Sequence, residues 1–122
     1  MDPETRAEMI LRLTETLAEC EAVTYGDLGE VTGLGPREVG RIMAQYGSAV
    51  PWWRVTNARG ELPPHLLERA RQLWAAEGMP VTADGCRLRL GAVRVPLADL
   101  AARFAPVGRD LAEQDPPSTV EP

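Results

Sequence analysis

The sequence has no lysine, and all 13 of its basic residues are arginines. A genome rich in G and C favours arginine codons and explains this bias most simply, although a planar guanidinium also pairs with phosphates and base edges better than an ammonium group does. Cysteine is scarce as well, because Cys20 and Cys86 are the only two and lie far apart in the chain. Their spacing supports neither a disulfide framework nor a zinc site, so we expect both to be small buried hydrophobic residues.

Other chemical signatures are missing too. The single histidine, His65, follows two prolines at an expected helix start, and no motif near it suggests a catalytic triad. The segment Gly33-Leu34-Gly35-Pro36 lacks the later glycines and the lysine of a phosphate-binding loop. We therefore expect no metal ion and no cofactor.

Long hydrophobic runs are also absent. No stretch approaches the roughly 20 apolar residues that span a bilayer, and the N-terminal Met-Asp-Pro-Glu lacks the basic start of a signal peptide. We expect a soluble, cytoplasmic protein with no membrane partner. Its 122 residues, 44% of them hydrophobic, suffice for a single core.

The net charge is −5, which for the whole chain is the wrong sign for a nucleic-acid-binding protein. The charge is nevertheless segregated. Residues 1–21 and 110–122 each carry −4, whereas residues 22–60 carry +1 and residues 81–109 carry +3. The middle of the chain is thus free to face phosphate groups, and we expect its affinity for DNA to be modest and to rise when the acidic tail is removed.

Hydrophobic periodicity predicts a series of short helices. Over residues 5–21 the apolar positions recur at steps of three and four, which indicates an amphipathic helix. Asp27 is a candidate N-cap for a brief helix that ends near residue 32, with Glu30 in capping-box spacing. After a glycine-containing turn, residues 36–46 form another amphipathic helix that begins at a proline.

These two short helices and their turn make a helix-turn-helix pattern. Arg37, Arg41 and Gln45 lie at positions i, i+4 and i+8 of the second helix, away from its apolar stripe. A charged stripe opposite an apolar one is also what any surface helix shows, so the pattern alone does not prove contact with DNA.

The second half of the chain predicts one more helix, which begins at the proline pair 63–64 and ends at Gly78. Residues 81–95 alternate in polarity like a β-hairpin, whose arginines either face solvent or add a phosphate-binding element. A last short helix follows over residues 97–104. The chain beyond it is rich in acids and proline and poor in apolar residues.

The expected architecture is a single domain at residues 1–107 with an acidic, disordered tail at residues 108–122. Its fold class is mainly α-helical with a small β-hairpin, of the helix-turn-helix or winged-helix-like DNA-binding type.

The most unusual local motif is the tandem pair Trp52-Trp53, which contains two of the three tryptophans in the chain. Composition alone favours two core anchors beside Pro51, with Arg54 as a surface cation. The alternative is an aromatic wall that stacks on a planar ligand such as an extruded nucleobase.

Three motifs follow one another along the chain: VTYGDLG at residues 23–29, PREVGR at residues 36–41 and VPWWRV at residues 50–55. In this order and spacing they resemble the DNA-binding domain of the O6-alkylguanine-DNA alkyltransferase family. The repair enzymes of that family carry Pro-Cys-His-Arg-Val, in which the cysteine takes the alkyl group and the histidine helps to activate it. Trp52 and Trp53 occupy those positions here. The resemblance is therefore closer to the alkyltransferase-like proteins, which bind O6-alkylguanine in DNA without repairing it and hand it to nucleotide excision repair.

The side chains of the motif also argue against alkyl transfer, independently of the resemblance. Alkyl transfer to a protein needs a thiolate activated by a neighbouring base. An indole has neither a usable lone pair nor a proton that titrates near neutral pH, and Cys20 and Cys86 lie outside the motif. We expect no enzymatic activity.

The resemblance implies a set of DNA contacts. In the family, the second helix of the helix-turn-helix enters the minor groove and an arginine fills the gap left by the flipped nucleotide. Arg37 holds that position, with Arg41 on the same face. Gly40 matches a glycine that lets the helix approach the DNA backbone. Tyr25 matches a tyrosine whose hydroxyl donates to the phosphate beside the flipped nucleotide; the alternative is a core aromatic with its hydroxyl bonded to the backbone. Arg54 would mainly order the loop.

The base pocket would be formed by Trp52 and Trp53. The base would stack on Trp52, whereas a second large ring at Trp53 would instead fill the pocket and exclude it. Glu77 matches a family glutamate that orients the histidine, and with Trp53 in place of that histidine a purely structural role is the alternative.

We therefore expect a monomeric, non-enzymatic damage-recognition protein that binds double-stranded DNA with an alkylated guanine and signals to nucleotide excision repair proteins. Two alternatives stay open. One is a general or regulatory DNA-binding adaptor of the same fold that has lost the base pocket. The other is an active methyltransferase that uses one of its two cysteines.

Overall fold

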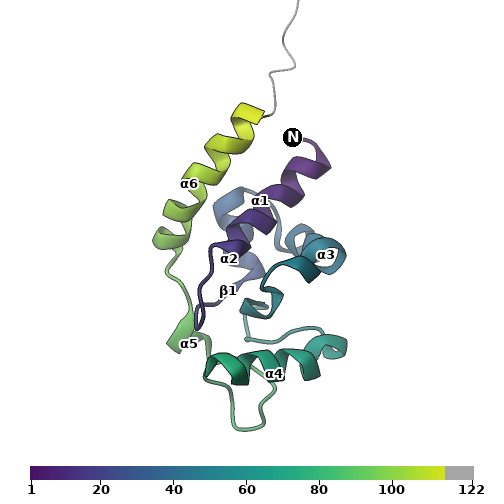
Figure 1. Ribbon diagram of the computed structural model, residues 1–122, viewed down its shortest axis with the longest axis vertical. Coiled ribbons are helices and arrows are strands. Elements are labelled where there is room, and N and C mark those ends of the chain that lie inside the picture. Colours follow the sequence, from purple (N-terminus) through teal and green to yellow (C-terminus); the bar gives the residue numbers. More distant parts are fainter. Residues whose placement is uncertain (115–122) are drawn as a thin grey trace, which may run out of the picture.

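Helices arranged around a central N-terminal helix make up most of the computed structural model, which describes residues 1–114 (Figure 1). The α-helices are α1 (Pro3–Glu15), α2 (Tyr25–Thr32), α3 (Pro36–Tyr46), α4 (Leu67–Glu77), α5 (Leu90–Val93) and α6 (Leu97–Gln114). Three short 3-10 helices, η1 (Gly47–Ala49), η2 (Trp52–Arg54) and η3 (Pro64–Leu66), join α3 to α4 together with the strand β2 (Val55–Thr56). The strand β1 (Val23–Thr24) precedes α2 and pairs with β2 in parallel.

Helix α1 begins as its sequence predicts but ends earlier. Asp2 caps its N-terminus by accepting a hydrogen bond from the Thr5 amide at 2.7 Å. The predicted end at residue 21 is wrong, because the helix stops at Glu15. The hydroxyl and amide of Thr16 both donate to the Leu13 carbonyl, which a continuing helix would use for the amide of Leu17.

Helices α2 and α3 form the expected helix-turn-helix, with one change at its start. The N-cap of α2 is Thr24 rather than Asp27: the Thr24 hydroxyl accepts from the Asp27 amide at 3.0 Å, and the Asp27 carboxylate accepts from the Thr24 amide at 3.1 Å. Asp27 is therefore the third residue of a capping box that starts three positions earlier than predicted. Gly33 ends α2 with φ at +82°, and Pro36 opens α3 as predicted.

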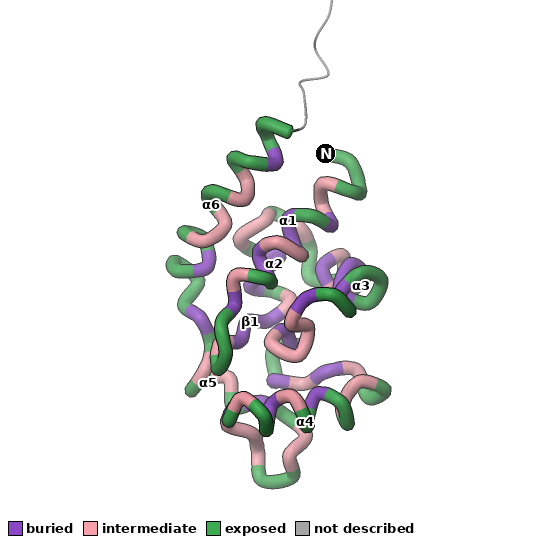
Figure 2. Tube along the Cα trace, in the orientation of Figure 1, coloured by how far each residue is buried: buried purple, intermediate pink, exposed green. Residues whose placement is uncertain are grey.

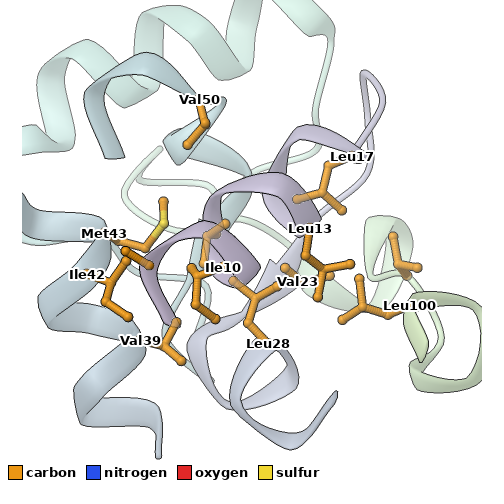
Figure 3. Packing of buried hydrophobic residues seen from close by; sticks show 13 residues of the cluster. Ile10, Leu13, Leu17, Val23, Leu28, Val39, Ile42, Met43, Val50 and Leu100 are labelled. Carbon is orange, nitrogen blue, oxygen red and sulfur yellow. The ribbon is translucent and has the colours of Figure 1, made fainter. Parts of the chain in front are cut away.

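The core consists of two clusters of buried hydrophobic residues. The larger one joins α1, α2, α3 and α6 through side chains such as Ile10, Leu13, Leu28 and Leu100, all fully buried (Figures 2 and 3). The smaller cluster surrounds Trp74 of α4 and includes the loop after it. Helix α1 packs against both α3 and α6, and Figure 1 shows these two helices on opposite sides of it.

The hairpin predicted over residues 81–95 forms only in its first half. Val81 and Leu88 make a single antiparallel bridge across a tight loop, but Leu90–Val93 is the helical turn α5. The Leu88 amide donates to the Gly60 carbonyl at 2.9 Å, and the chain around Arg94 pairs in parallel with Ala22. The second arm of the expected hairpin therefore finds its backbone partners before β1, in a segment distant in sequence.

The last helix is longer than predicted. α6 continues from Leu97 to Gln114, past Pro106 and past the boundary expected at residue 107. Leu100 and Leu111 are buried on the same side, so the apolar spacing continues where the acidic composition suggested a tail. Arg12 of α1 also pairs with Asp110 near its end. The remainder of the predicted tail, residues 115–122, lies outside the described residues.

Candidate nucleic-acid interface

A cavity of about 210 Å³ opens behind α3, between the start of α2 and the segment that contains η3. Its lining includes Tyr25 from α2, Gly40 and Met43 from α3, Trp52 from η2, and Leu62 and His65. None of the lining residues is an aspartate, a glutamate or an arginine. Pockets for drug-sized ligands enclose roughly 300–1,000 Å³, so this smaller and mostly apolar cavity suits a single planar ring system.

The two adjacent tryptophans point to different places. Trp52 lines the cavity and packs against both hydrophobic clusters, whereas Trp53 is not part of the lining. The two rings are nearly perpendicular, with an interplanar angle of 88° and centroids 5.7 Å apart. Trp53 therefore does not fill the cavity, and Trp52 is the tryptophan that borders it.

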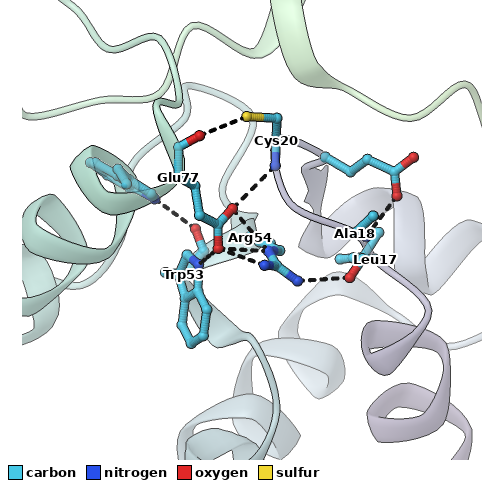
Figure 4. A network of polar contacts seen from close by, with 8 residues as sticks. Leu17, Ala18, Cys20, Trp53, Arg54 and Glu77 are labelled. Atoms are coloured by element: carbon cyan, nitrogen blue, oxygen red, sulfur yellow. Dashed lines mark hydrogen bonds and ion pairs between the residues drawn. The ribbon is translucent and has the colours of Figure 1, made fainter.

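Trp53 is anchored on the far side by Glu77, the last residue of α4. The indole Nε1 of Trp53 donates to Glu77 Oε2 at 2.7 Å, and Arg54 Nη2 donates to the same oxygen at 2.6 Å (Figure 4). The backbone amide of Cys20 donates to Glu77 Oε1 at 3.1 Å. Burial alone would raise the pKa of Glu77, but these hydrogen bonds outweigh it and lower the pKa, so Glu77 is a carboxylate at neutral pH.

Arg54 belongs to this network rather than to a DNA-binding surface. Its side chain is only 11% exposed, and its Nη1 donates to the Leu17 carbonyl at 2.7 Å while the other nitrogens contact Glu77. The guanidinium is therefore not presented to a phosphate, and the structure supports only the expected role in ordering the loop.

Helix α3 presents the other predicted residues to solvent. Arg37 is exposed in the first turn and makes no ion pair with a described residue. Arg41 is 64% exposed and lies 3.5 Å from Glu38, which also pairs with Arg6. A Cβ atom built on Gly40 would meet nothing within 4 Å, so the protein itself does not require glycine there.

Tyr25 lies between the core and the cavity. It is half-buried, packs against the larger hydrophobic cluster and lines both the cavity and a neighbouring open groove of about 480 Å³. Burial raises the pKa of its hydroxyl, which therefore stays protonated and able to donate a hydrogen bond. Its hydroxyl forms no hydrogen bond to a described residue, so it is available as a donor, and the backbone bond expected of a purely core tyrosine is not observed.

Two arginines of residues 81–109 pair with carboxylates from other parts of the chain. Arg94 makes a two-pronged contact with Asp27, at 3.0 and 2.7 Å, and Arg103 does the same with Glu21, at 2.8 Å for both bonds. α6 also lies across the molecule from α3 (Figure 1). Arg94 and Arg103 are therefore engaged within the protein, whereas Arg87, Arg89 and Arg109 of the same segment are exposed.

Sequence reasoning missed some residues of the cavity and misjudged the cysteines. His65, Met43 and Leu62 line the cavity, although no motif or spacing set them apart. Cys20 is exposed, with φ at +64°, and Cys86 is half-buried, so the expectation that both are buried was wrong. Cys86 lines the neighbouring groove, outside the cavity itself.

Two further observations concern residues 1–114 alone. No group of three or more histidine, cysteine or acidic side chains is arranged to hold a metal ion there. No helix in that part of the chain has the length and apolar character needed to cross a membrane.

The fold and this site define a helix-turn-helix DNA-binding domain with a ring-sized cavity behind its second helix. Residues 6–79 match the family model described as "6-O-methylguanine DNA methyltransferase, DNA binding domain". This span is more than half of the chain, and the protein belongs to this family.

Relatives and a solved structure agree with that assignment. The chain is 32% identical over 84 residues to the "DNA base-flipping protein" of Escherichia coli (strain K12). The aligned region covers 64% of this chain and 65% of that protein. It is 35% identical over 68 residues to the protein of the same name from Vibrio parahaemolyticus, covering 51% of this chain and 68% of that one. The match thus spans just under two thirds of the Escherichia coli relative.

The structure also resembles that of S. pombe Atl1 in complex with damaged DNA containing O6-carboxymethylguanine. The TM-score is 0.66, and the match covers 79% of this chain and 100% of Atl1 at 23% sequence identity. At this identity the likeness establishes a shared fold.

Proposed function

We propose that this protein binds double-stranded DNA through α3 in the minor groove and takes an O6-alkylated guanine out of the base stack into the cavity beside Trp52, without transferring the alkyl group. The observation that carries the proposal is the open cavity of about 210 Å³ with Trp52 as one wall, directly behind the exposed arginines of α3. In the repair enzymes whose motif the sequence resembles, the reactive cysteine stands at the position of Trp52.

The arrangement suits nucleotide flipping physically. Extruding a base costs a few kcal/mol of lost stacking and pairing. Stacking on an aromatic ring recovers roughly 1–3 kcal/mol per base, and Trp52 supplies such a ring. Arg37 is exposed and unpaired among the described residues, so it is free to enter the gap that the base leaves. The cavity lacks acidic groups, so no negative charge in it repels the nucleotide.

The same geometry supports the absence of alkyl transfer. Neither cysteine lines the cavity: Cys20 donates its thiol to the Glu77 carbonyl at 3.0 Å, and Cys86 lies in the neighbouring groove. With an indole at the reactive position, the cavity lining offers no cysteine thiol to take the alkyl group. The mass of the intact protein should therefore be unchanged after incubation with alkylated DNA, and an added methyl mass on either cysteine would contradict this.

The names of the relatives support binding rather than catalysis. Two bacterial relatives are called DNA base-flipping proteins, and the structural match is a complex with O6-alkylated DNA. A protein that only marks the lesion needs a partner to remove it, which fits nucleotide excision repair proteins. The proposed setting is a monomer in the bacterial cytoplasm, where the DNA of such organisms lies.

The decisive experiment compares duplexes that differ by one methyl group. Fluorescence anisotropy across a salt series, with matched duplexes that contain guanine or O6-methylguanine, should show tighter binding to the damaged duplex. Trp52→Ala should reduce this preference and leave binding to intact DNA nearly unchanged, whereas Arg37→Ala should weaken both. Arg109→Ala removes an exposed arginine on α6, away from α3, and serves as the matched control.

Two other results of the binding experiment would contradict the proposal. Equal, weak binding to both duplexes would exclude lesion recognition. If Arg37→Ala lowers affinity but the wild type shows no preference, the protein is a general DNA-binding adaptor of the same fold.

A further inference from the structure

We infer that Trp53 is a positioning residue, which holds the ring of Trp52 in place as a rigid wall of the base cavity. The inference rests on the proposed function, since it concerns selectivity for damaged DNA. It assigns part of that selectivity to a side chain that does not line the cavity.

Trp53 is fixed from three directions. Its Nε1 donates to Glu77 at 2.7 Å, its backbone carbonyl accepts from the Trp74 indole at 2.7 Å, and its ring lies under the Arg54 guanidinium at 5.3 Å. Trp74 is fully buried in the smaller core cluster. The position of Trp53 is therefore set by α4 at two points: the indole of Trp74 in the core, and the carboxylate of Glu77, which Figure 4 shows.

Trp52 depends on this anchor for its own orientation. The edge-on contact between the two rings, at 88°, is the favourable arrangement for an aromatic pair. Trp52 makes no side-chain hydrogen bond to a described residue, so packing alone holds its ring. Trp53 contacts Trp52 without being part of the cavity lining, so it can hold the Trp52 ring without occupying the cavity.

A wall that is fixed before binding improves selectivity. A mobile Trp52 would have to become ordered when the base enters, and that loss of freedom would weaken binding of the flipped base. Binding to intact DNA does not use the cavity and would not change. Loss of the Trp53 anchor should therefore reduce the preference for damaged DNA more than the affinity for DNA in general.

The test compares two substitutions at the same residue. Trp53→Phe keeps an aromatic edge for Trp52 but removes the N–H that reaches Glu77, and Trp53→His keeps a ring N–H. The ratio of Kd values for intact and O6-methylguanine duplexes should fall about five- to ten-fold in Trp53→Phe and recover in Trp53→His. Asp110→Asn breaks the carboxylate pair with Arg12 between α1 and α6, which shares no residue with the Glu77 network or the cavity lining, and should leave the ratio unchanged.

A lower Tm with an unchanged ratio in Trp53→Phe would show that Trp53 is merely structural, which overturns the inference. A second measurement needs neither variants nor DNA. In the wild-type protein, the indole N–H protons of Trp53 and Trp74 should exchange slowly with solvent, and that of Trp52 rapidly. Equal, fast exchange of Trp52 and Trp53 would also overturn it. A wild type without preference for the damaged duplex would instead contradict the proposed function, whatever the exchange rates show.

Discussion

Gly40 is an unfavourable choice for α3 unless something outside the protein requires it. Glycine in a helix interior is less stable than alanine by roughly 0.5–1 kcal/mol, because its backbone loses more freedom on folding. No atom of this protein lies within 4 Å of the position a Cβ would occupy, yet Gly40 lines the cavity. The fold therefore does not require glycine here, and we propose that the missing side chain serves a ligand that approaches α3.

Gly40→Ala should make the protein more stable and the complex weaker. We expect unfolding free energy to rise by roughly 0.5–1 kcal/mol and DNA affinity to fall several-fold. Urea unfolding and anisotropy on the same preparations measure both. Gly91→Ala in α5 adds a methyl group to equally open space and should leave DNA binding unchanged. Unaltered DNA affinity in Gly40→Ala would show that α3 does not approach DNA closely at this position.

Residues identified from the sequence were those in contiguous motifs. Arg37, Gly40 and Trp52 stand in short runs whose order and spacing are informative without a structure. The sequence does not identify His65 as a cavity residue, because its position depends on the fold. It reaches the cavity because η3 lies beside residues of α2 and α3. The resemblance did pair Glu77 with position 53, and the Trp53 indole takes up that hydrogen bond in place of the histidine.

At the scale of elements, the angle between α2 and α3 depends on a close approach at Gly29. A Cβ built there would lie 2.5 Å from the Leu34 carbonyl oxygen, in the turn between the two helices. Backbone cannot move aside as a flexible side chain does. The turn therefore fixes how far α3 projects from the core.

Gly29→Ala should destabilise the protein by roughly 1–3 kcal/mol through this overlap. Gly26→Ala is the matched control in the same helix, because its Cβ would meet only the Thr24 hydroxyl at 3.6 Å, an ordinary contact. We expect a clear loss of Tm for the first variant and almost none for the second. Equal Tm values would mean that the turn relaxes freely and does not set the geometry of α3.

Elements that depend on local sequence signals were predicted correctly, whereas those that depend on contacts with distant segments were not. The α3 helix was predicted correctly because a proline start and a regular apolar stripe are local signals. The end of α1 depends on the Thr16 hydroxyl, and the extra length of α6 depends on packing of Leu111 against other helices. The failed half of the hairpin pairs with Ala22, a partner that alternation of polarity does not reveal.

Over the whole molecule, the absence of lysine has a structural counterpart. Arg54, Arg94 and Arg103 each bind a carboxylate through two or more of their nitrogen atoms, and these pairs tie distant segments together. A guanidinium suits this geometry because its parallel N–H groups match the two oxygens of a carboxylate. Part of the basic charge counted in the sequence is thus neutralised by carboxylates of the protein itself and is not available to bind phosphate.

These pairs also predict how stability depends on pH. Hydrogen bonds from Arg103 lower the pKa of Glu21 to about 2. For Asp27, burial opposes ionisation, but hydrogen bonds from Arg94 and Thr24 outweigh it and lower the pKa. A carboxylate whose pKa is lower in the folded state adds stability above its ordinary pKa, and that stability is lost as the pH falls towards the folded value.

Tm should therefore be nearly constant from pH 7 to about 5.5 and fall steeply between about pH 4.5 and 2. The contribution of Glu21 is at most about 3 kcal/mol, and the partial exposure of its pair with Arg103 reduces it. Glu21→Gln should lower Tm at pH 7 and make the acid decline shallower. Glu30→Gln changes an exposed glutamate without an ion pair to a described residue, and should match the wild type throughout. An acid decline of unchanged steepness in Glu21→Gln would mean that the Glu21–Arg103 pair does not link α6 to the rest of the fold energetically.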